Sequence, residues 1–330
     1  MRLILTALLF ATVIHAQQPA APKPKPKAFT DPAQTDEDFA IQGEYIGEID
    51  GKSYGVQIWA QGGGKFEAVS HLGGLPGAGW DGDRASITRV PGTRAAGEKN
   101  AAFTSPDGTI KAEVNGASIL VNNADGLKIM ELNRMNRESP TLGAQPPENA
   151  VVLFDGKAVN RFPNSRVDEK IGALMEGITS EDTFGDCSLH VEFLLPYMPD
   201  ARGQGRGNSG LYLQGRYEVQ MLDSFALEGK DNECGGLYKI ASPKVNMCLP
   251  PLTWQTYDID FTAAKYDAGG QKTANAKITV KHNGVLIHEN QELPGATTSA
   301  PNKEAPTPGP VHLQNHGNPV RYRNIWVVKK

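Results

Sequence analysis

Residues 207–224 read Gly-Asn-Ser-Gly-Leu-Tyr-Leu-Gln-Gly-Arg-Tyr-Glu-Val-Gln-Met-Leu-Asp-Ser. This stretch predicts two β-strands joined by a turn at Gly215, because apolar and polar residues alternate on both sides of it. Successive side chains of a strand point to opposite faces of the sheet. Tyr217, Val219 and Met221 are therefore expected to face a core.

The same alternation places a row of hydrogen-bonding side chains on the other face of the second strand. Arg216, Glu218 and Gln220 supply a cation, a carboxylate and an amide in that row. Three side chains able to make paired hydrogen bonds suit a ligand rich in hydroxyl groups, which is a sugar. The alternative is an ordinary polar strand face that carries one Arg–Glu pair.

The composition favours a soluble protein rich in β-structure and turns. Of the 330 residues 39% are apolar, and 36 are glycine and 23 proline, which is more typical of turns between strands than of helices. A chain of this length can form two domains. The formal net charge of −4 argues against a nucleic-acid partner, because phosphate binding needs a basic surface.

The N-terminus has the pattern of a secretory signal. Arg2 precedes an apolar run over residues 3–14, and Ala16 offers a small residue for cleavage, which predicts a signal peptide over residues 1–16. Since the run is too short to span a bilayer, we expect a periplasmic or secreted bacterial protein with no stable membrane insertion after cleavage. The Pro/Lys-rich tract 17–36 is expected to be an extended, solvated linker.

Turn signals divide the rest of the chain into two β-units, so the expected fold class is all-β. Residues 37–136 hold short strands separated by glycine-rich and Asn-Gly turns, which predicts a small antiparallel barrel or sandwich. Residues 137–149 contain three prolines and are expected to be an interdomain linker. Residues 150–330 hold many alternating strands and few helical stretches, which predicts a β-sandwich.

Two further strands of the second domain carry polar rows. These rows are Ser188, His190 and Glu192 on one strand, and His312, Gln314 and, if the strand extends that far, His316 on the other. If both strands neighbour the 216–222 strand, all three rows line one cleft, in which Glu192 and Glu218 face each other. Two close carboxylates raise the pKa of one of them, which would prepare a general base.

Five segments of the second domain form a recognisable series. They are Val-Val-Leu-Phe-Asp-Gly-Lys at 151–157, Leu-His-Val-Glu-Phe at 189–193, the 207–224 stretch, Trp-Gln-Thr-Tyr-Asp-Ile at 254–259, and 309–317 followed by 321–325. In this order and spacing they resemble the 3-keto-disaccharide hydrolase family, also described as 3-keto-glucoside 1,2-lyase/hydratase domains. The resemblance covers residues 150–329, and no single segment is specific by itself.

The resemblance implies a concanavalin-like or lectin-like jelly-roll sandwich acting on glycosides whose sugar carries a ketone at C3. The ketone acidifies the proton on C2, a general base removes it, and a hydrogen-bonding group stabilises the enolate. A general acid protonates the leaving oxygen at C1, and hydration of the resulting glucal completes the cleavage. No cofactor is definite, although His190, Glu192 and His316 could hold a divalent metal that polarises the ketone.

These arguments select a set of candidate site residues. The expected catalytic residues are Glu192, Glu218 and His316. The expected substrate-binding residues are His190, Asn208, Arg216, Gln220, Asp223, Lys239, Trp254, His312 and Gln314. Structural roles remain open for several: Asn208 could cap the strand, Asp223 could form a turn, and Lys239 could be a solvated loop residue.

Two other functions compete with this one. Retaining glycosidases need two close carboxylates, and those on a lectin-like sandwich carry them as Glu-x-Asp-x-x-Glu; here Gln220 stands in the middle position, which disfavours that chemistry. A non-catalytic glycan-binding module would rely on exposed aromatics such as Trp254 and Tyr212.

Cys234 and Cys248 either close a disulfide in an oxidising compartment or remain free buried thiols.

Overall fold

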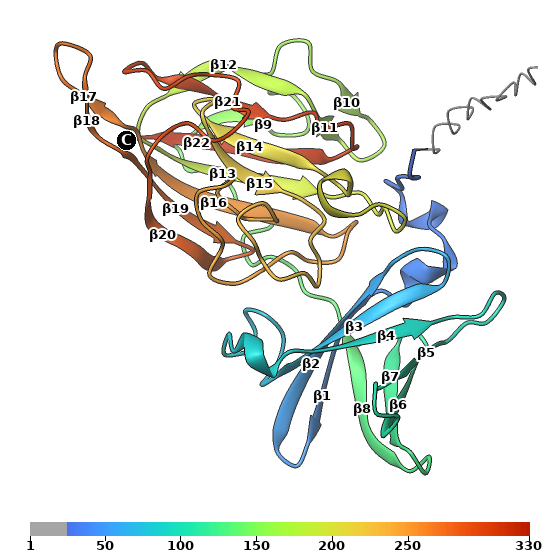
Figure 1. Cartoon of the computed structure of the whole chain (residues 1–330). Coiled ribbons are helices and arrows are strands. Elements are labelled where there is room, and N and C mark those ends of the chain that lie inside the picture. The colour runs from blue at the N-terminus through green and yellow to red at the C-terminus, as the bar shows by residue number, and fades with distance from the viewer. Residues whose placement is uncertain (1–24) are drawn as a thin grey trace, which may run out of the picture.

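The computed structural model describes residues 25–330, which form two β-domains, the N-terminal one below the C-terminal one in Figure 1. The expected signal peptide at 1–16 and the linker up to residue 24 lie outside the described residues. Within the described part, no helix is long and apolar enough to cross a membrane. The expected all-β fold class is confirmed, because every described strand pair is antiparallel and the helical segments are short 3-10 turns.

The N-terminal domain is a closed barrel of eight antiparallel strands in which each strand pairs with the next, and β8 pairs with β1. Its strands are β1 Gly43–Ile49, β2 Lys52–Ala60, β3 Lys65–Leu72, β4 Thr88–Thr93, β5 Ala101–Thr104, β6 Ile110–Val114, β7 Ser118–Asn123 and β8 Lys128–Met135. Closure removes the free edges that an open sheet of this size would expose.

The C-terminal domain packs a large sheet against a small one. The large sheet has the order β10-β11-β22-β13-β16-β19-β20, with β9 also paired to β22. Its strands are β9 Val151–Phe154, β10 Val167–Asp168, β11 Ala173–Met175, β13 Cys187–Leu194, β16 Trp254–Thr262, β19 Ala276–His282, β20 Val285–Leu293 and β22 Arg321–Lys329. The small sheet, in the order β12-β21-β14-β15, contains β12 Ile178–Phe184, β14 Ser209–Leu213, β15 Tyr217–Met221 and β21 Gly309–Leu313. A separate hairpin pairs β17 Lys265–Tyr266 with β18 Lys272–Ala274.

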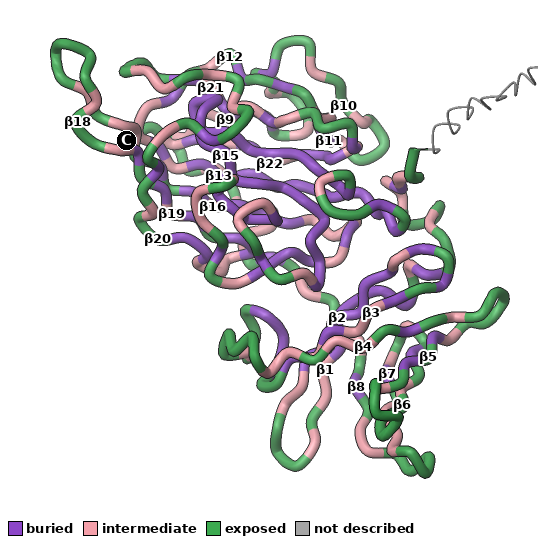
Figure 2. The backbone as a smooth tube through the Cα atoms, viewed as in Figure 1, coloured by how far each residue is buried: buried purple, intermediate pink, exposed green. Residues whose placement is uncertain are grey.

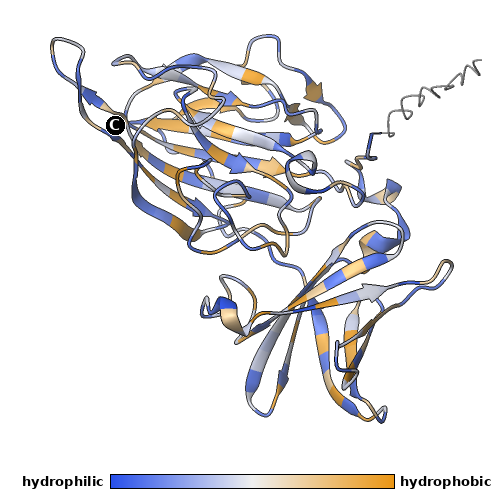
Figure 3. Cartoon of the chain, viewed as in Figure 1, coloured by the Kyte–Doolittle hydropathy of each residue, from blue (hydrophilic) through white to orange (hydrophobic). Residues whose placement is uncertain are grey.

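The core of the sandwich lies between the two sheets, where alternation along the strands directs the apolar side chains. Leu189, Val191 and Phe193 of β13 share one buried cluster with Tyr217 and Val219 of β15. The hydropathy colours alternate accordingly along the strands in Figure 3. The prediction that Tyr217, Val219 and Met221 face a core is confirmed.

The hairpin that links β14 to β15 turns at the expected place. Gln214 and Gly215 both have positive φ, 56° and 64°, and Leu213 pairs with Tyr217 across the three-residue connection 214–216. Arg216 belongs to this turn and not to the strand, so the polar row of β15 consists of Glu218 and Gln220.

Residues of the described part of the first linker, 25–36, and of the second linker, 137–149, contact the folded domains. Phe29, in the tract expected to be solvated, is buried against Tyr197 of the sandwich domain, with ring centroids 5.7 Å apart. The expectation of a purely solvated spacer over 17–36 is therefore wrong at this position. Barrel residues Trp59 and Val69 belong to the same buried cluster as the sandwich core, so the domains share an apolar contact.

Candidate functional site

The outer face of the small sheet carries one polar row that crosses three strands. Tyr212 of β14 is the cross-strand partner of Glu218 on one side and of His312 on the other. Since Leu211 and Leu313 of the same strands point into the core, the three polar side chains share the opposite face. A carboxyl, a phenol and an imidazole therefore lie side by side.

Glu218 has the properties of a general base in this row. Its side chain is buried, and this burial raises its pKa to about 7, although a hydrogen bond from the Tyr212 hydroxyl acts in the opposite direction. Gln314 Nε2 in turn donates to the Tyr212 hydroxyl oxygen at 3.0 Å. A carboxyl with a pKa close to neutral can both accept and return a proton at physiological pH.

His312 stands at the other end of the row. Its Nδ1 lies 2.8 Å from Thr179 Oγ1, and burial lowers its pKa below the usual value. The imidazole is therefore neutral at pH 7, and it can offer a hydrogen bond but no positive charge.

Amide groups beside Glu218 present unused acceptors. Asn208 and Gln220 are both buried, and Gln204 joins them: Asn208 Nδ2 donates to the Gln204 carbonyl at 2.8 Å, and Gln220 Nε2 to Gln204 Oε1 at 3.3 Å. Within the described residues, Asn208 Oδ1 and Gln220 Oε1 have no hydrogen-bond partner. Buried acceptors without donors are costly, and sugar hydroxyls are donors that would satisfy them.

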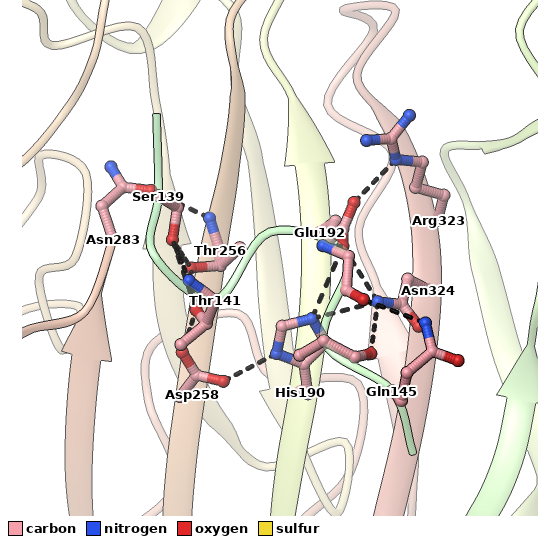
Figure 4. Close-up of polar contacts among 12 residues, drawn as sticks. Ser139, Thr141, Gln145, His190, Glu192, Thr256, Asp258, Asn283, Arg323 and Asn324 are labelled. Carbon is pink, nitrogen blue, oxygen red and sulfur yellow. Dashed lines mark hydrogen bonds and ion pairs between the residues drawn. The ribbon is translucent and has the colours of Figure 1, made fainter. Parts of the chain in front are cut away.

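A second polar network covers the outer face of the large sheet (Figure 4). Glu192 accepts hydrogen bonds from the Gly143 N–H at 2.6 Å, Arg323 Nε at 2.7 Å and Asn324 Nδ2 at 2.9 Å. His190 places Nδ1 2.6 Å from Asp258 Oδ1 and Nε2 3.7 Å from Glu192 Oε1. The network thus binds backbone and side chains that belong to different segments of the chain.

This network fastens the segment 139–144 to the large sheet. Ser139 Oγ lies 2.6 Å from Thr256 Oγ1, Thr141 Oγ1 donates to Asp258 Oδ2 at 2.7 Å, and Asn324 Nδ2 donates to the Ala144 carbonyl at 3.0 Å. The expected interdomain linker is therefore tied down across β13, β16 and β22.

The pKa shifts of Glu192 and His190 agree with a structural role for this network. Burial alone would raise the pKa of Glu192, but hydrogen bonds from His190, Asn324, Arg323 and the Gly143 N–H lower it to about 2. Burial would lower the pKa of His190, but the two carboxylates beside it outweigh burial and raise it. Glu192 is thus a fixed anion at neutral pH.

The structure separates the two glutamates that the sequence brought together. Glu192 lies on the outer face of the large sheet and Glu218 on the outer face of the small sheet, with the apolar core between them. The expectation that they face each other in one cleft is wrong, because alternation shows which side of a strand is buried and does not show which sheet holds the strand. Desolvation, and not a second carboxylate, raises the pKa of Glu218.

Two predicted sugar ligands have their hydrogen-bonding groups engaged within the protein. Arg216 donates to the carbonyls of Lys303, Ala305 and Thr307 at 2.8, 3.2 and 2.9 Å. It therefore holds the 303–307 loop. Asp223 is buried in an ion pair with Arg206 Nε at 2.7 Å.

The remaining candidates lie outside the polar row carried by β14, β15 and β21. His316 is exposed in the turn between β21 and β22, and Lys239 is exposed in a loop with φ 59°. Trp254 begins β16, and the Arg323 guanidinium lies 4.0 Å from its ring centroid. The expected metal group of His190, Glu192 and His316 does not assemble, and within residues 25–330 no cluster of three or more suitable ligands occurs.

Sequence reasoning missed some of the residues that the site uses. Gln204 lies in a short 3-10 turn, Gly203–Gly205, and no strand periodicity pointed to it. Sequence reasoning considers Tyr212 only as an aromatic for the glycan-binding alternative, although alternation from Leu211 and Leu213 directs it to the outer face beside Glu218. Cys234 and Cys248 are free buried thiols, as is Cys187.

Antiparallel two-sheet sandwiches include lectin domains, which bind carbohydrates. A family model described as the 3-keto-alpha-glucoside-1,2-lyase-like domain matches residues 149–328. This match spans more than half of the chain, and the chain therefore belongs to that family, which confirms the resemblance found in the sequence.

Two solved structures are similar to just over half of the chain. A protein of Parabacteroides distasonis, described as a candidate glycosyl hydrolase, is 30% identical over 56% of this chain and 84% of its own, with a TM-score of 0.50. Another protein of that organism and description is 17% identical over 56% of this chain and 94% of its own, with a TM-score of 0.40. Among curated proteins, none matches the chain.

Proposed function

We propose that this chain cleaves 3-keto-glycosides by elimination across C1 and C2 followed by hydration, with Glu218 as the general base. The observation that carries the proposal is the buried Glu218 carboxyl, whose pKa is raised to about 7. A base for a carbon acid works best when its pKa lies near the operating pH. Membership of the family supports the reaction class.

The first step moves one proton. The Glu218 carboxylate takes the C2 proton, the C2–H electron pair forms the C2=C3 double bond, and the carbonyl oxygen at C3 takes up the negative charge. A neutral His312 or an amide N–H of Gln314 can donate a hydrogen bond to this oxygen. Tyr212 is a positioning residue, because its hydroxyl hydrogen-bonds Glu218 and accepts from Gln314.

The second step breaks the glycosidic bond. The enolate electrons return to form the C3 carbonyl and a C1=C2 double bond, and the C1–O bond electrons leave with the aglycone oxygen. That oxygen takes a proton, for which the newly protonated Glu218 is a source on the same sheet face. Addition of water across C1=C2 then gives the free 3-keto sugar.

In this proposal the amide side chains around Glu218 bind the sugar. The unpartnered oxygens of Asn208 and Gln220 accept hydroxyl protons, and Gln204 fixes the orientation of both amides. A buried polar group that loses its donor discriminates strongly against ligands lacking the hydroxyl.

The test compares a 3-keto-glucoside with its unoxidised parent, each with and without a chelator. Turnover of the keto form alone supports the proposal, turnover of the parent indicates a conventional glycosidase, and binding without turnover indicates a glycan-binding module.

Glu218→Gln should lower turnover by about 10²–10⁴-fold. Glu289→Gln, at a side chain 57% exposed on the same domain, is the matched control and should leave turnover unchanged.

We also propose that the protein acts outside the cytoplasm, in the periplasm or the medium. The support is the Arg2, apolar run and Ala16 pattern of the N-terminus. N-terminal sequencing of the protein from its native host checks this directly: a mature chain that starts near residue 17 supports export, and an intact Met1 contradicts it.

A further inference from the structure

The interior of the N-terminal barrel contains a cavity of about 410 Å³. It lies in the domain before residue 149, outside the family match. Eight-stranded barrels have an interior that side chains can just fill or that can hold one small ligand. The question is which of these two cases applies to this barrel.

One end of the barrel is filled by side chains. Ile58, Phe66, Phe103, Val114 and Leu132 are all almost fully buried there. The Phe103 ring lies against Gly92, where a Cβ would overlap it. This end is closed in the manner of an ordinary core.

The other end is lined by the same kind of residue but is not filled. Ala68, Val90, Ala112, Val121 and Met130 face the interior and remain only partly buried. They continue the inward alternation of the strands whose deeper residues are fully buried. Small side chains at Ala68 and Ala112 leave the space, and the hairpins around this end are exposed in Figure 2.

The chemistry of the lining defines what can occupy the cavity. Of the 18 described lining residues, 14 have purely apolar side chains, and the other four, Tyr54, Ser70, Thr88 and Ser105, each carry one hydroxyl. None of these residues carries a charge or an amide. Ser70 and Thr88 are cross-strand partners on β3 and β4, where they can meet one polar group of a ligand.

Water and sugars are poor occupants of such a space. A bound water needs two to four polar partners, and this lining offers few. A sugar would leave most of its hydroxyls without partners, which is costly in a buried apolar site. A hydrocarbon molecule would instead remove the half-exposed walls from water.

We propose that the barrel is a binding site for an uncharged, mainly hydrocarbon small molecule, which enters at the open end and lies against Ala68, Ala112 and Val121. The closed end fixes how far the ligand enters. The Ser70–Thr88 pair contacts its single polar group. The site belongs to the barrel alone and is independent of the chemistry at Glu218.

The experiment titrates the full chain with N-phenyl-1-naphthylamine, a neutral probe whose fluorescence increases in apolar surroundings. Saturable binding of one probe per chain, with displacement by 1-decanol and none by glucose, is the expected result. Absence of saturable binding, or displacement by glucose, overturns the proposal.

Lumen variants locate the probe. Ala112→Leu and Ala68→Leu fill the cavity and should each weaken binding by at least about tenfold, which corresponds to 1.4 kcal/mol. Ala102→Leu makes the same change at an exposed position of β5 and should leave binding unchanged. Equal effects of Ala112→Leu and Ala102→Leu would overturn the assignment.

A spectroscopic measurement covers the case in which a filled barrel does not fold. In methyl-labelled wild-type protein, 1-decanol should shift the signals of Ile110 and Val121 in the barrel. It should leave those of Ile259 and Val280 in the sandwich core unmoved. The opposite pattern would contradict a barrel site.

Discussion

Gly210 lies directly against the carboxyl of Glu218: a Cβ at position 210 would overlap Glu218 Oε1. Gly210 is the residue of β14 that pairs with Gln220, and it precedes Tyr212 on the same outer face. The space for the buried carboxyl is therefore provided by the absence of a side chain on the neighbouring strand. This arrangement gives the first prediction.

Gly210→Ala should displace the Glu218 carboxyl and impair catalysis. The added methyl group overpacks a closely filled site, which costs about 1–3 kcal/mol of stability, and moves the base from the C2 proton. We expect turnover of a 3-keto-glucoside to fall at least about tenfold, since small misplacements reduce rates strongly. Gly185→Ala is the control, because no atom lies within 4 Å of a Cβ there. Equal turnover of the two variants would contradict the prediction.

Arg216→Met tests whether this arginine binds the sugar or holds the 303–307 loop. Its guanidinium is buried and donates to three carbonyls of that loop, so its loss leaves buried acceptors unpaired. We expect a loss of roughly 2–4 kcal/mol in the free energy of unfolding and faster hydrogen exchange in the loop. The KM should change by less than about threefold.

Arg161→Met provides the comparison, because Arg161 is 46% exposed and pairs with Asp182 at 3.3 Å. Exposed pairs contribute about 0–1 kcal/mol, so this variant should unfold close to the wild-type denaturant midpoint. A large rise in KM for Arg216→Met, without loss of stability, would return Arg216 to the sugar-binding residues.

The sequence predicted those features that depend on one strand at a time. Alternation placed Tyr217 and Val219 in the core, and the glycine turn at 215 fixed the hairpin that brings Tyr212 beside Glu218. Strand order could not be predicted, because it depends on which of two sheets each strand joins. His190 and Glu192 on β13 therefore show the same alternation as Glu218 on β15. The β13 pair nevertheless lies on the outer face of the large sheet, and Glu218 lies on the outer face of the small sheet.

The hydrogen bonds that loop residues form could not be predicted from the sequence either. Gln204 and the segment 139–144 have no periodicity, but they determine the surroundings of Gln220 and Glu192. Whether a polar residue on a strand face binds a ligand or stabilises the fold depends on whether other segments of the chain form hydrogen bonds with it. Only the folded arrangement distinguishes Glu192, whose oxygens accept internal hydrogen bonds, from Gln220, whose Oε1 has no partner within the described residues.

Glu192→Gln should reduce stability while turnover stays within about threefold of wild type. The pKa of Glu192 is lowered to about 2 from its ordinary value of 4.5, so its stabilising contribution is present above pH 4.5 and is lost as the pH falls toward 2. At pH 7 we expect a loss of roughly 1.5–3 kcal/mol, which is typical of hydrogen bonds to a charged group.

Denaturant unfolding at pH 7 and pH 3 measures this effect. The difference between wild type and Glu192→Gln should shrink at the lower pH, because at pH 3 the carboxyl of the unfolded wild-type chain is mostly protonated, whereas that of the folded chain is still an anion. Unfolding then takes up a proton, which favours the unfolded state. A turnover number that falls by 10² or more, with unchanged stability, would instead place Glu192 in the reaction.

The pH dependence of activity and of stability should both report the Glu218 carboxyl. Burial raises its pKa in the folded protein to about 7, above the ordinary value of 4.5. The base is active only when deprotonated, so kcat/KM for a 3-keto-glucoside should rise as the pH passes through about 7.

Because the folded state binds this proton more tightly, the contribution of Glu218 to stability is fully present below pH 4.5 and is lost as the pH rises through 7. Glu218→Gln should therefore be more stable than wild type at pH 8.5 and should lose the rise in kcat/KM. Thermal unfolding and kinetics across pH 5–9 measure both effects, and a wild-type profile without a rise near pH 7 would remove Glu218 as the base.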